Sequence, residues 1–311
     1  MKLLVGLPLF FVLASCAAQA PAAPEDQAPA QSLLDARRAF HTKLVPGQND
    51  KTPADRPPAD LMQMVKYPAP GGQYPAYLSV PFGDGKPHPA IVWITGGDCN
   101  SIGDVWSEQP ARNDQTAVQW EKAGFVMMYP SLRGGNDNPG VKEGFLGEVD
   151  DVVAAADFLA KQPGVDPQRI YLGGHSTGGT LALLVAEQSA RFRAIFAFGP
   201  VDDVAGYGAD SGFLPFDVSD LAEVRVRSPI YWLDGVKSPT YVLEGDSGSS
   251  NIGSLRALER ESTNPQLHFL EVRGRNHFSA LAPANAYLAG VVAAQNGEIT
   301  QGGLDIVVEG Q

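Results

Sequence analysis

The feature that most constrains this chain is the run from Ile170 to Gly179, in which an apolar segment leads directly into Gly-His-Ser-Thr-Gly. The pattern Gly-x-Ser-x-Gly between a strand and a helix is typical of a sharp turn that exposes a serine hydroxyl at one end of a sheet. Such a turn strains the serine backbone, and neighbouring segments approach closely only where a residue lacks a Cβ atom. We therefore expect Ser176 at the tip, with glycines 174, 178 and 179 allowing the close packing; a glycine-rich turn that merely contains a serine is the alternative.

The rest of the chain predicts an α/β fold. From about Leu61 onward, short apolar segments alternate with helical stretches, which indicates a mostly parallel central sheet with helices on both faces. The expected strands are 76–80, 90–95, 125–129, 170–173, 195–199, 240–243 and 268–272. The expected helices are 114–122, 148–161, 178–190, 254–261 and 284–295. Residues 73–80, which follow two glycines, suit an antiparallel edge strand.

The main domain, which we place at 61–311, has an extension before it and an insertion within it. Residues 32–60 form an N-terminal extension with a short helix expected within 32–45 and a proline-rich passage after it. Residues 202–238 are the one long insertion, and their length suits a short lid. The aromatic residues of this insertion either wall an apolar acyl pocket or pack the lid down; they are Tyr207, Phe213, Phe216, Tyr231 and Trp232.

The first residues predict export. Met1 and Lys2 precede the apolar run 3–14, which is too short to span a bilayer but suits a secretory signal peptide. The run closes on Leu-Ala-Ser-Cys, which resembles a bacterial lipobox with Cys16 as the lipidated residue. Ordinary cleavage after Ala20 is the alternative, which Pro21 disfavours. We expect a lipoprotein signal peptide at 1–15, an Ala/Pro-rich tether at 16–31, and a lipid-anchored protein of the bacterial cell envelope, at the outer membrane or its periplasmic face.

Charge and cysteine content exclude several classes of function. The formal net charge of −12 makes nucleic acid and anionic membrane surfaces poor partners. The chain has two cysteines, so with Cys16 lipidated Cys99 has no intramolecular partner, and neither a disulfide framework nor a zinc cluster is expected. The phosphate-binding, zinc-protease and dinucleotide motifs are also absent from the sequence, and no cofactor or metal is expected. The sequence does not indicate an oligomeric state.

A serine hydroxyl needs a base within hydrogen-bond reach, usually a histidine. In folds with this serine turn, the chain order is serine, acid, histidine. Of the five histidines, His268 and His277 come after Ser176 at a suitable distance along the chain. His268 falls within an expected strand, whereas His277 lies in the loop after it. We therefore expect His277 to be the base, against the alternative of a solvated loop histidine.

At this point the chain resembles the α/β-hydrolase superfamily and, more narrowly, the catalytic domain of the prolyl oligopeptidase family of serine peptidases. The resemblance covers about residues 65–295 at the level of the fold and is specific in 130–180 and around 277. The segments that carry it are 131–135 (Ser-Leu-Arg-Gly-Gly), the helical stretch 148–159, 164–170 (Gly-Val-Asp-Pro-Gln-Arg-Ile), the serine turn, and 276–278 (Asn-His-Phe).

The acid of the expected triad departs from the family pattern. The resemblance implies a carboxylate three residues after the glycine that closes the seventh strand, but counting from Gly245 that position is Gly248. We rank Asp246 first, Glu244 second and Asp203 third as the residue that orients His277. For each, a solvated carboxylate without a catalytic role is an equal alternative.

The oxyanion hole requires two main-chain N–H groups directed at the developing negative charge. One is expected from Thr177, directly after the serine. The second is expected from Gly97 or Asp98, in the loop after 90–95, where related hydrolases show His-Gly-Gly and this chain shows Thr-Gly-Gly. A purely packing role for the two glycines is the alternative. Cys99 is not expected to act as a nucleophile because Ser176 occupies the turn.

These features predict a serine hydrolase that acts through an acyl-enzyme on an ester or amide bond. The resemblance implies a prolyl oligopeptidase-type serine peptidase, and a carboxylesterase of the same fold is the alternative. A second alternative, from another class, is a catalytically silent envelope lipoprotein that binds ligands, which the displaced acid suggests. The expected partner is a small-molecule ester or a peptide substrate.

Overall fold

The computed structural model describes residues 32–46, 49–208, 212–295 and 297–310. The predicted signal peptide, the tether and Cys16 therefore lie outside the described residues. Within those residues, every helix is too short or too polar to cross a lipid bilayer.

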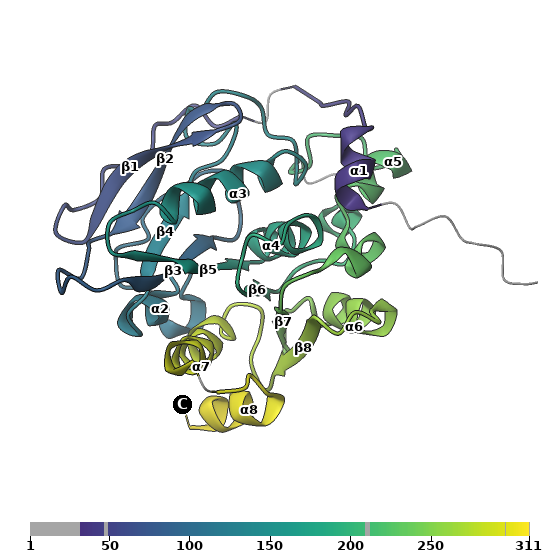
Figure 1. Ribbon diagram of the computed structural model, residues 1–311. Coiled ribbons are helices and arrows are strands. Elements are labelled where there is room, and N and C mark those ends of the chain that lie inside the picture. Colours follow the sequence, from purple (N-terminus) through teal and green to yellow (C-terminus); the bar gives the residue numbers. More distant parts are fainter. Residues whose placement is uncertain (1–31, 47–48, 209–211, 296, 311) are drawn as a thin grey trace, which may run out of the picture. The chain divides into compact units, whose positions relative to one another are not determined.

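The described chain forms one mixed sheet of eight strands in the order β1-β2-β4-β3-β5-β6-β7-β8 (Figure 1). The six strands β4, β3, β5, β6, β7 and β8 are parallel to one another, whereas β1 pairs antiparallel with β2 and β2 antiparallel with β4. This confirms the predicted α/β fold with a mostly parallel sheet. The strands are β1 Met62–Ala69, β2 Gly72–Ser79, β3 His88–Ile94, β4 Val126–Pro130, β5 Val165–His175, β6 Ile195–Phe198, β7 Thr240–Gly245 and β8 Leu267–Val272.

One prediction about the sheet was wrong. Residues 73–80 do form an antiparallel strand, β2, but the edge of the sheet is β1, which was not predicted. Most side chains of β1 are exposed or half-exposed, and the strand contains Lys66 and Pro68. Its sequence therefore lacks the continuous apolar run that marks the central strands.

Helices cover both faces of the sheet. Buried residues of α3, α4 and α6 pack in one apolar cluster, and buried residues of α2, α7 and α8 pack in a second cluster on the opposite face (Figure 1). The α-helices are α1 Leu33–Arg38, α2 Val118–Lys122, α3 Glu148–Leu159, α4 Thr177–Gln188, α5 Leu221–Arg225, α6 Ile252–Glu261, α7 Leu281–Ala294 and α8 Gln301–Glu309. All five predicted helices of the catalytic domain and the short helix in the extension are present, whereas α5 and α8 were not predicted.

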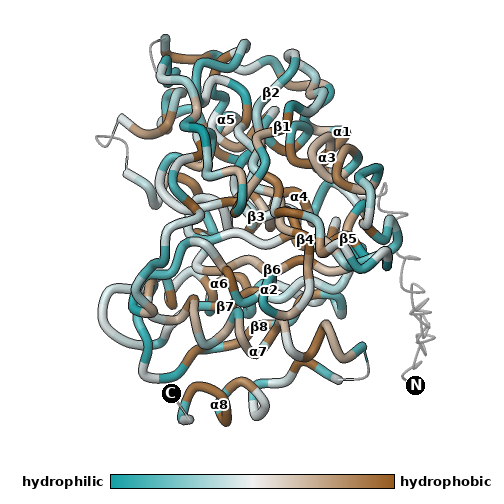
Figure 2. The backbone as a smooth tube through the Cα atoms, turned by 90° about the vertical axis from the view of Figure 1, so that its left-hand side faces the viewer, coloured by the Kyte–Doolittle hydropathy of each residue, from teal (hydrophilic) through white to brown (hydrophobic). Residues whose placement is uncertain are grey.

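The central strand β3 illustrates how the sequence produces these layers. Successive side chains of a strand point to opposite faces, so Ala90, Val92 and Ile94 belong to the first cluster, while Ile91 and Trp93 belong to the second. Both sets are buried, which explains why the strand is continuously apolar. Figure 2 shows the hydrophobic residues gathered in the interior around α4 and the central strands.

The described part of the insertion 202–238, residues 202–208 and 212–238, contains short helical turns. These are η2 Val204–Tyr207, α5, η4 Pro229–Tyr231 and η5 Leu233–Gly235. Of its aromatic residues, Phe216 and Trp232 are buried, and Tyr231 is exposed. Phe216 and Trp232 pack the insertion onto the domain. Its role as a lid stays a prediction.

The N-terminal extension packs against this insertion. The Arg37 guanidinium of α1 donates hydrogen bonds to the main-chain oxygens of Phe145 and Val226, at 2.8 and 2.9 Å. The main-chain N–H of Val45 donates to Pro215 at 2.6 Å. Burial lowers the pKa of Arg37 to about 10. Through these bonds, residues 32–45 hold the insertion next to the loop before α3.

Candidate active site

Ser176 lies at the junction of β5 and α4, as the sequence predicted. Its backbone has φ of +56° and ψ of −115°, a conformation that L-amino acids rarely adopt, and its N–H donates to Phe198 O at 2.7 Å. A Cβ atom on Gly178 would collide with the main chain of Ile94, and one on Gly179 with that of Phe198. The strained turn is thus tightly enclosed by β3 and β6, and the half-buried serine sits at the carboxyl ends of the parallel strands.

His277 lies in the loop between β8 and α7 and faces the end of β6. Its N–H donates to Ser249 O at 3.0 Å, and its side chain is 11 % exposed. Gly199 directly follows Phe198, and a Cβ atom on Gly199 would lie 2.5 Å from Cε1 of His277. The imidazole therefore packs against the main chain of Gly199. The residue before it, Phe198, is the one that accepts the hydrogen bond from the N–H of Ser176.

Glu244 supplies the carboxylate next to His277. Nδ1 of His277 lies 2.8 Å from Oε2 of Glu244, which is almost fully buried at the end of β7. The same carboxylate accepts hydrogen bonds from the main-chain N–H groups of Gly245, at 2.6 Å, and Asn251, at 3.0 Å. These two amides fix the carboxylate, and a carboxylate fixed in this way determines which ring nitrogen of the histidine carries a proton.

The structure does not bring the other two candidate acids to His277. Oδ1 of Asp246 accepts hydrogen bonds from Ser247 Oγ, at 2.8 Å, and from the N–H of Gly274, at 2.7 Å. Asp203 caps the helical turn η2 by accepting from Ala205 N at 2.8 Å. Asp246 therefore links its own loop to the loop after β8, Asp203 supports the turn η2, and the second-ranked candidate, Glu244, is the one in contact with the imidazole.

The candidate oxyanion loop lies against the serine turn. Thr177 begins α4, so its N–H is among those without a partner inside the helix. Its hydroxyl donates to Gly97 O at 2.9 Å, and Gly97 has a φ of +79°. The N–H of the preceding Gly96 is engaged by Gln115 Oε1 at 3.2 Å. The structure thus brings Thr177 into contact with Gly97, and donation to an oxyanion by the N–H groups of Thr177, Gly97 or Asp98 stays a prediction.

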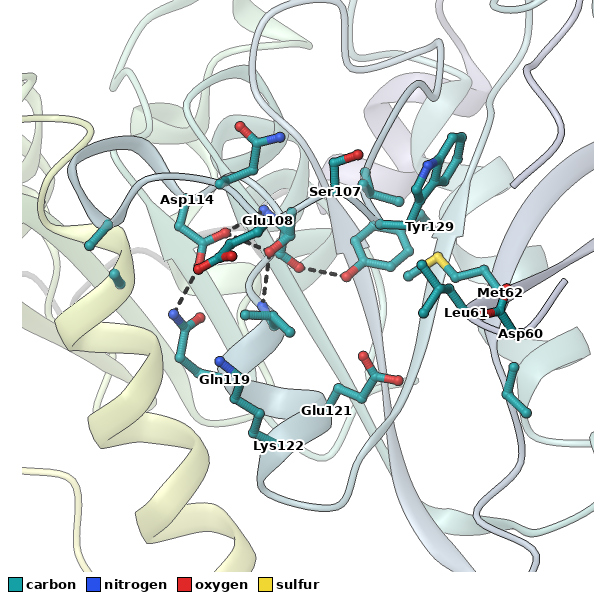
Figure 3. Close-up of a pocket in the computed structure, with 18 residues that line it drawn as sticks. Asp60, Leu61, Met62, Ser107, Glu108, Asp114, Gln119, Glu121, Lys122 and Tyr129 are labelled. Atoms are coloured by element: carbon teal, nitrogen blue, oxygen red, sulfur yellow. Dashed lines mark hydrogen bonds between the residues drawn. The ribbon is translucent and has the colours of Figure 1, made fainter. Parts of the chain in front are cut away.

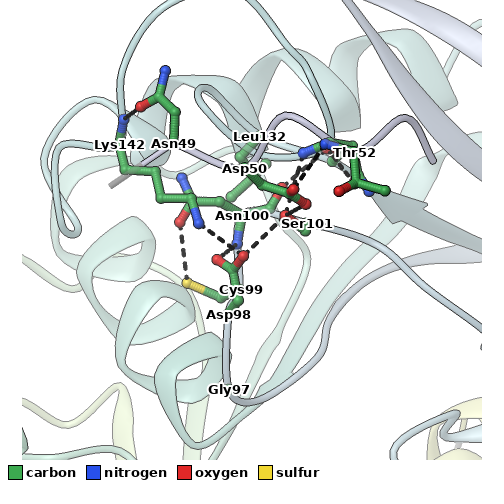
Figure 4. A network of polar contacts seen from close by, with 12 residues as sticks. Asn49, Asp50, Thr52, Gly97, Asp98, Cys99, Asn100, Ser101, Leu132 and Lys142 are labelled. Atoms are coloured by element: carbon green, nitrogen blue, oxygen red, sulfur yellow. Dashed lines mark hydrogen bonds and ion pairs between the residues drawn. The ribbon is translucent and has the colours of Figure 1, made fainter. Parts of the chain in front are cut away.

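A polar network fixes this loop from its outer side (Figure 4). Asp98 Oδ2 accepts from Lys142 Nζ at 2.8 Å and from Ser101 Oγ at 2.9 Å. Ser101 Oγ also lies 3.0 Å from Oδ2 of Asp50, in the N-terminal extension. On the buried side, Asn100 donates to Arg133 O at 2.8 Å. Three separate segments therefore determine the position of the loop: the extension, the segment after β4, and the loop that carries Lys142.

The ring of His175, next to Ser176, was not identified as a site residue from the sequence. It is almost fully buried, its centroid lies 4.4 Å from that of His277, and its Nε2 lies 3.0 Å from His277 O. Burial lowers the pKa of His175 to about 3, with a contribution from the neighbouring His277. Its place in Gly-x-Ser was the available signal, but position in a motif does not reveal which way a side chain points.

A cavity of about 310 Å³ adjoins the candidate oxyanion loop. Its lining includes Cys99, Phe145 and Phe213, with Asp98 and Lys142 among its polar residues. The ring of Tyr207 stacks on that of Phe145 with the centroids 5.6 Å apart. The Tyr207 hydroxyl shares a hydrogen bond of 2.7 Å with Thr180 Oγ1. Burial raises the pKa of the Cys99 thiol, so this residue is not an activated nucleophile.

A larger cavity of about 540 Å³ lies elsewhere, between the start of β1, α2 and the loop around Trp106 (Figure 3). The three residues Ser176, His277 and Glu244 are not among its lining. The carboxylate of Asp114 in its wall accepts hydrogen bonds from the N–H of Thr116 and from the side-chain amide of Gln119. Among the described residues, no three His, Cys, Asp or Glu side chains gather in a way that could hold a metal ion.

Comparisons with known proteins identify relatives. A sequence model of the prolyl oligopeptidase family matches residues 112–234. The chain is 26% identical over 218 residues to the uncharacterized peptidase YtmA of Bacillus subtilis (strain 168), an alignment that covers 66% of this chain and 75% of YtmA. The match of the family model includes the serine turn and ends before His277.

Solved structures share the fold. A puromycin-hydrolyzing peptidase of Mycobacterium tuberculosis superposes with a TM-score of 0.62 and 18% identity, over 76% of this chain and 40% of that one. An acylaminoacyl peptidase in complex with Z-Gly-Gly-Phe-chloromethyl ketone gives a TM-score of 0.59 and 15% identity, over 79% of this chain and 44% of that one. The chain thus spans less than half the length of these two peptidases. It has the α/β-hydrolase fold and resembles the catalytic domain of the prolyl oligopeptidase family of serine peptidases.

Proposed function

We propose that this protein is a serine hydrolase that cleaves an amide or peptide bond through an acyl-enzyme. The observation that carries this proposal is the hydrogen bond between Nδ1 of His277 and Oε2 of Glu244, next to a serine held in a strained turn. The match to the prolyl oligopeptidase family model and the peptidase relatives support the same class. We assign the nucleophile to Ser176, the base to His277 and the orienting acid to Glu244.

The chemistry follows from these positions. Glu244 holds the proton of His277 on Nδ1, which leaves the lone pair of Nε2 available as a base. Nε2 accepts the hydroxyl proton as Ser176 Oγ attacks the carbonyl carbon, and it returns the proton to the leaving amine. The N–H of Thr177 and an N–H of Gly97 or Asp98 stabilise the oxyanion of the tetrahedral intermediate. Water then attacks the acyl-enzyme through the same base, which releases the acid product and regenerates Ser176.

The cavity beside the oxyanion loop suits the acyl portion of a substrate. It begins at Asp98 and Cys99 and is walled by the rings of Phe145 and Phe213. About 310 Å³ is at the small end of the range for ligand pockets, so we assign it to one apolar or aromatic side chain of a peptide. A carboxylesterase activity on small acyl esters is compatible with the same triad, but the relatives favour peptides.

The decisive experiment is labelling of the full chain with a fluorophosphonate probe, which reacts with an activated serine. We expect wild-type protein to be labelled and the Ser176→Ala variant to remain unlabelled. Peptide amides and p-nitrophenyl esters with the same acyl group are then compared by kcat/KM, to separate peptidase from esterase. Folded wild-type protein that never reacts with the probe would contradict the enzyme proposal and favour a silent binding protein.

We propose in addition that the protein is an exported lipoprotein held to the bacterial envelope through Cys16. The support is the sequence alone: an apolar run that ends on Leu-Ala-Ser-Cys, followed by an Ala/Pro-rich tether. Metabolic labelling of bacteria with a radioactive or alkyne-bearing fatty acid should mark the wild-type protein and not a Cys16→Ser variant. Equal labelling of both proteins would contradict this assignment.

A further inference from the structure

His175 connects three parts of the candidate active site. It belongs to β5, directly before Ser176, and its buried ring touches the ring of His277 with the centroids 4.4 Å apart. Its Nε2 lies 3.0 Å from the carbonyl oxygen of His277. Its Nδ1 lies 3.0 Å from Oε1 of Gln115, and the same Gln115 oxygen accepts the N–H of Gly96, in the loop that leads to the candidate oxyanion hole.

Both ring nitrogens of His175 face oxygens that accept hydrogen bonds: Nε2 faces His277 O, and Nδ1 faces Oε1 of Gln115. The orientation of the Gln115 amide is fixed, because its Oε1 accepts the N–H of Gly96 and its Nε2 donates to Asn113. Burial keeps the His175 ring neutral at neutral pH, so the ring carries one proton and donates to one of these two oxygens. We place this proton on Nε2, so that the ring donates to His277 O and not to Gln115.

This bond matters because it fixes the main chain of the residue that carries the base. On one side, the N–H of His277 donates to Ser249 O at 3.0 Å. On the other side, its carbonyl accepts from His175, while the ring of Phe278 packs edge-on against both imidazoles. The side chain of His277 is thus held between Gly199, Glu244 and the ring of His175.

We propose that His175 is a positioning residue for His277, which fixes the base against Glu244 by donating a hydrogen bond from Nε2 to the main-chain oxygen of His277. The assignment of His277 as the base rests on the proposed function above. His175 neither touches the substrate nor exchanges a proton with it. Its effect on the reaction is transmitted through the placement of the His277 ring.

Three substitutions separate this hydrogen bond from simple packing. The amide nitrogen of His175→Gln reaches the position of Nε2 and can donate to His277 O. The shorter side chain of His175→Asn matches only the Nδ1 side of the ring. His175→Phe keeps an aromatic ring but has no donor. His268, which stacks on Tyr241 on the exposed side of β8, is the matched control, as His268→Phe.

We expect kcat on a peptide amide to fall roughly 10- to 100-fold in His175→Phe and His175→Asn, with KM nearly unchanged, because a small displacement of the base is costly. His175→Gln should regain most of the loss, and His268→Phe should match the wild type. Wild-type kcat in His175→Phe would overturn the proposal. A fall of equal size in the Gln, Asn and Phe variants would also overturn it, because it would indicate a packing role alone.

A spectroscopic measurement tests the proposal independently of activity. A proton shared between His277 Nδ1 and Glu244 gives a far-downfield resonance in the proton NMR spectrum of the full chain. We expect this resonance to broaden or disappear in His175→Phe and to persist in His175→Gln. Its persistence in folded His175→Phe would refute the positioning role even if the protein proves not to be a hydrolase. Should His175→Phe fail to fold, His175→Asn, whose amide does not reach His277 O from the position of Nε2, is measured in the same way and should broaden the resonance.

Discussion

The Nδ1 atom of His277 lies 2.8 Å from the Oε2 atom of Glu244, although the two residues are 33 positions apart in the chain. Glu244 stands on the carbonyl end of β7, and His277 lies just beyond the end of the adjacent strand β8. Parallel neighbours place their carboxyl ends at the same edge of a sheet, and this topology produces the contact. Two main-chain amides hold the carboxylate in the orientation that the imidazole requires.

The first prediction concerns this contact. Glu244→Gln replaces an acceptor-only group by an amide whose NH₂ group favours the wrong tautomer of His277. We expect kcat to fall by roughly 10³- to 10⁴-fold with the fold intact, as for the loss of a triad acid. Asp246→Asn, two residues away and turned toward Gly274, is the control and should retain near-wild-type kcat. A severe loss in Asp246→Asn with an active Glu244→Gln would reverse the assignment.

The sequence could predict Ser176 and His277 because each has a local signature. The serine turn needs a particular arrangement of glycines between a strand and a helix, and the histidine needs a loop after the last strand. The acid has no such signature. Glu244 is the residue before Gly245 and lies within the strand, and only the twist and pairing of β7 with β8 determine that its side chain reaches His277. A count along the chain therefore pointed to Gly248, which has no carboxylate, and the nearby Asp246 was ranked first in its place.

The second prediction uses the strain at Ser176. Its φ of +56° is unfavourable for serine and alanine alike but accessible to glycine. Ser176→Gly and Ser176→Ala both lose the hydroxyl, so the difference between their stabilities reports the backbone strain at this position. We expect Ser176→Gly to have a free energy of unfolding about 1 kcal/mol higher than Ser176→Ala, measured by urea denaturation. Equal stabilities, or a more stable alanine variant, would mean that the turn stores no strain.

The third prediction concerns the buried ion pair of Arg133 and Asp151. The guanidinium Nε and one terminal nitrogen each lie 2.9 Å from a carboxylate oxygen of Asp151, which is fully buried in α3. Asp151 also accepts from the N–H of Arg133 at 3.0 Å. Removing one charge leaves the other buried without its main partner, so Asp151→Asn should lower the free energy of unfolding by about 3 kcal/mol.

The control for this ion pair is the neighbouring residue Asp150, which is exposed. Its carboxylate accepts a hydrogen bond from Gln188 at the surface, at 2.9 Å. Asp150→Asn should change the free energy of unfolding by less than about 1 kcal/mol. Thermal unfolding followed by circular dichroism compares the two variants. Similar losses of stability in both would show that the buried Arg133–Asp151 pair stabilises the fold no more than the exposed contact of Asp150.

The fold was predictable to the extent that burial leaves a pattern in the sequence. Each central strand is buried on both faces, so each appears as an apolar run. β1 was not predicted because much of it is exposed. α8 was not predicted because Gly302 and Gly303 lie in its first turn, where glycine disfavours a helix. α8 forms nonetheless, since Leu304 and Val308 are buried in the cluster under α7. Such tertiary contacts override local propensity and are not visible in the sequence.

The last prediction concerns Glu187, in the final turn of α4. It is 3 % exposed, and neither carboxylate oxygen has a hydrogen-bond partner among the described residues. Burial raises the pKa of this carboxyl well above its usual range, and the nearby charge of Arg37 opposes the rise only in part. Between the ordinary pKa of glutamate and the raised value, the folded protein therefore binds more protons than the unfolded chain. The contribution of Glu187 to the stability of the protein therefore falls as the pH rises through this window.

Glu187→Gln removes this titration while keeping the shape of the side chain. We expect the variant and the wild type to have similar melting temperatures near pH 4.5, and the variant to become progressively more stable by comparison as the pH rises toward 8. Glu259→Gln, an exposed substitution on α6, should show no such trend. If Glu187→Gln instead loses stability relative to the wild type as the pH rises, the carboxylate must be ionised in the folded protein, stabilised by Arg37, and burial does not control its protonation.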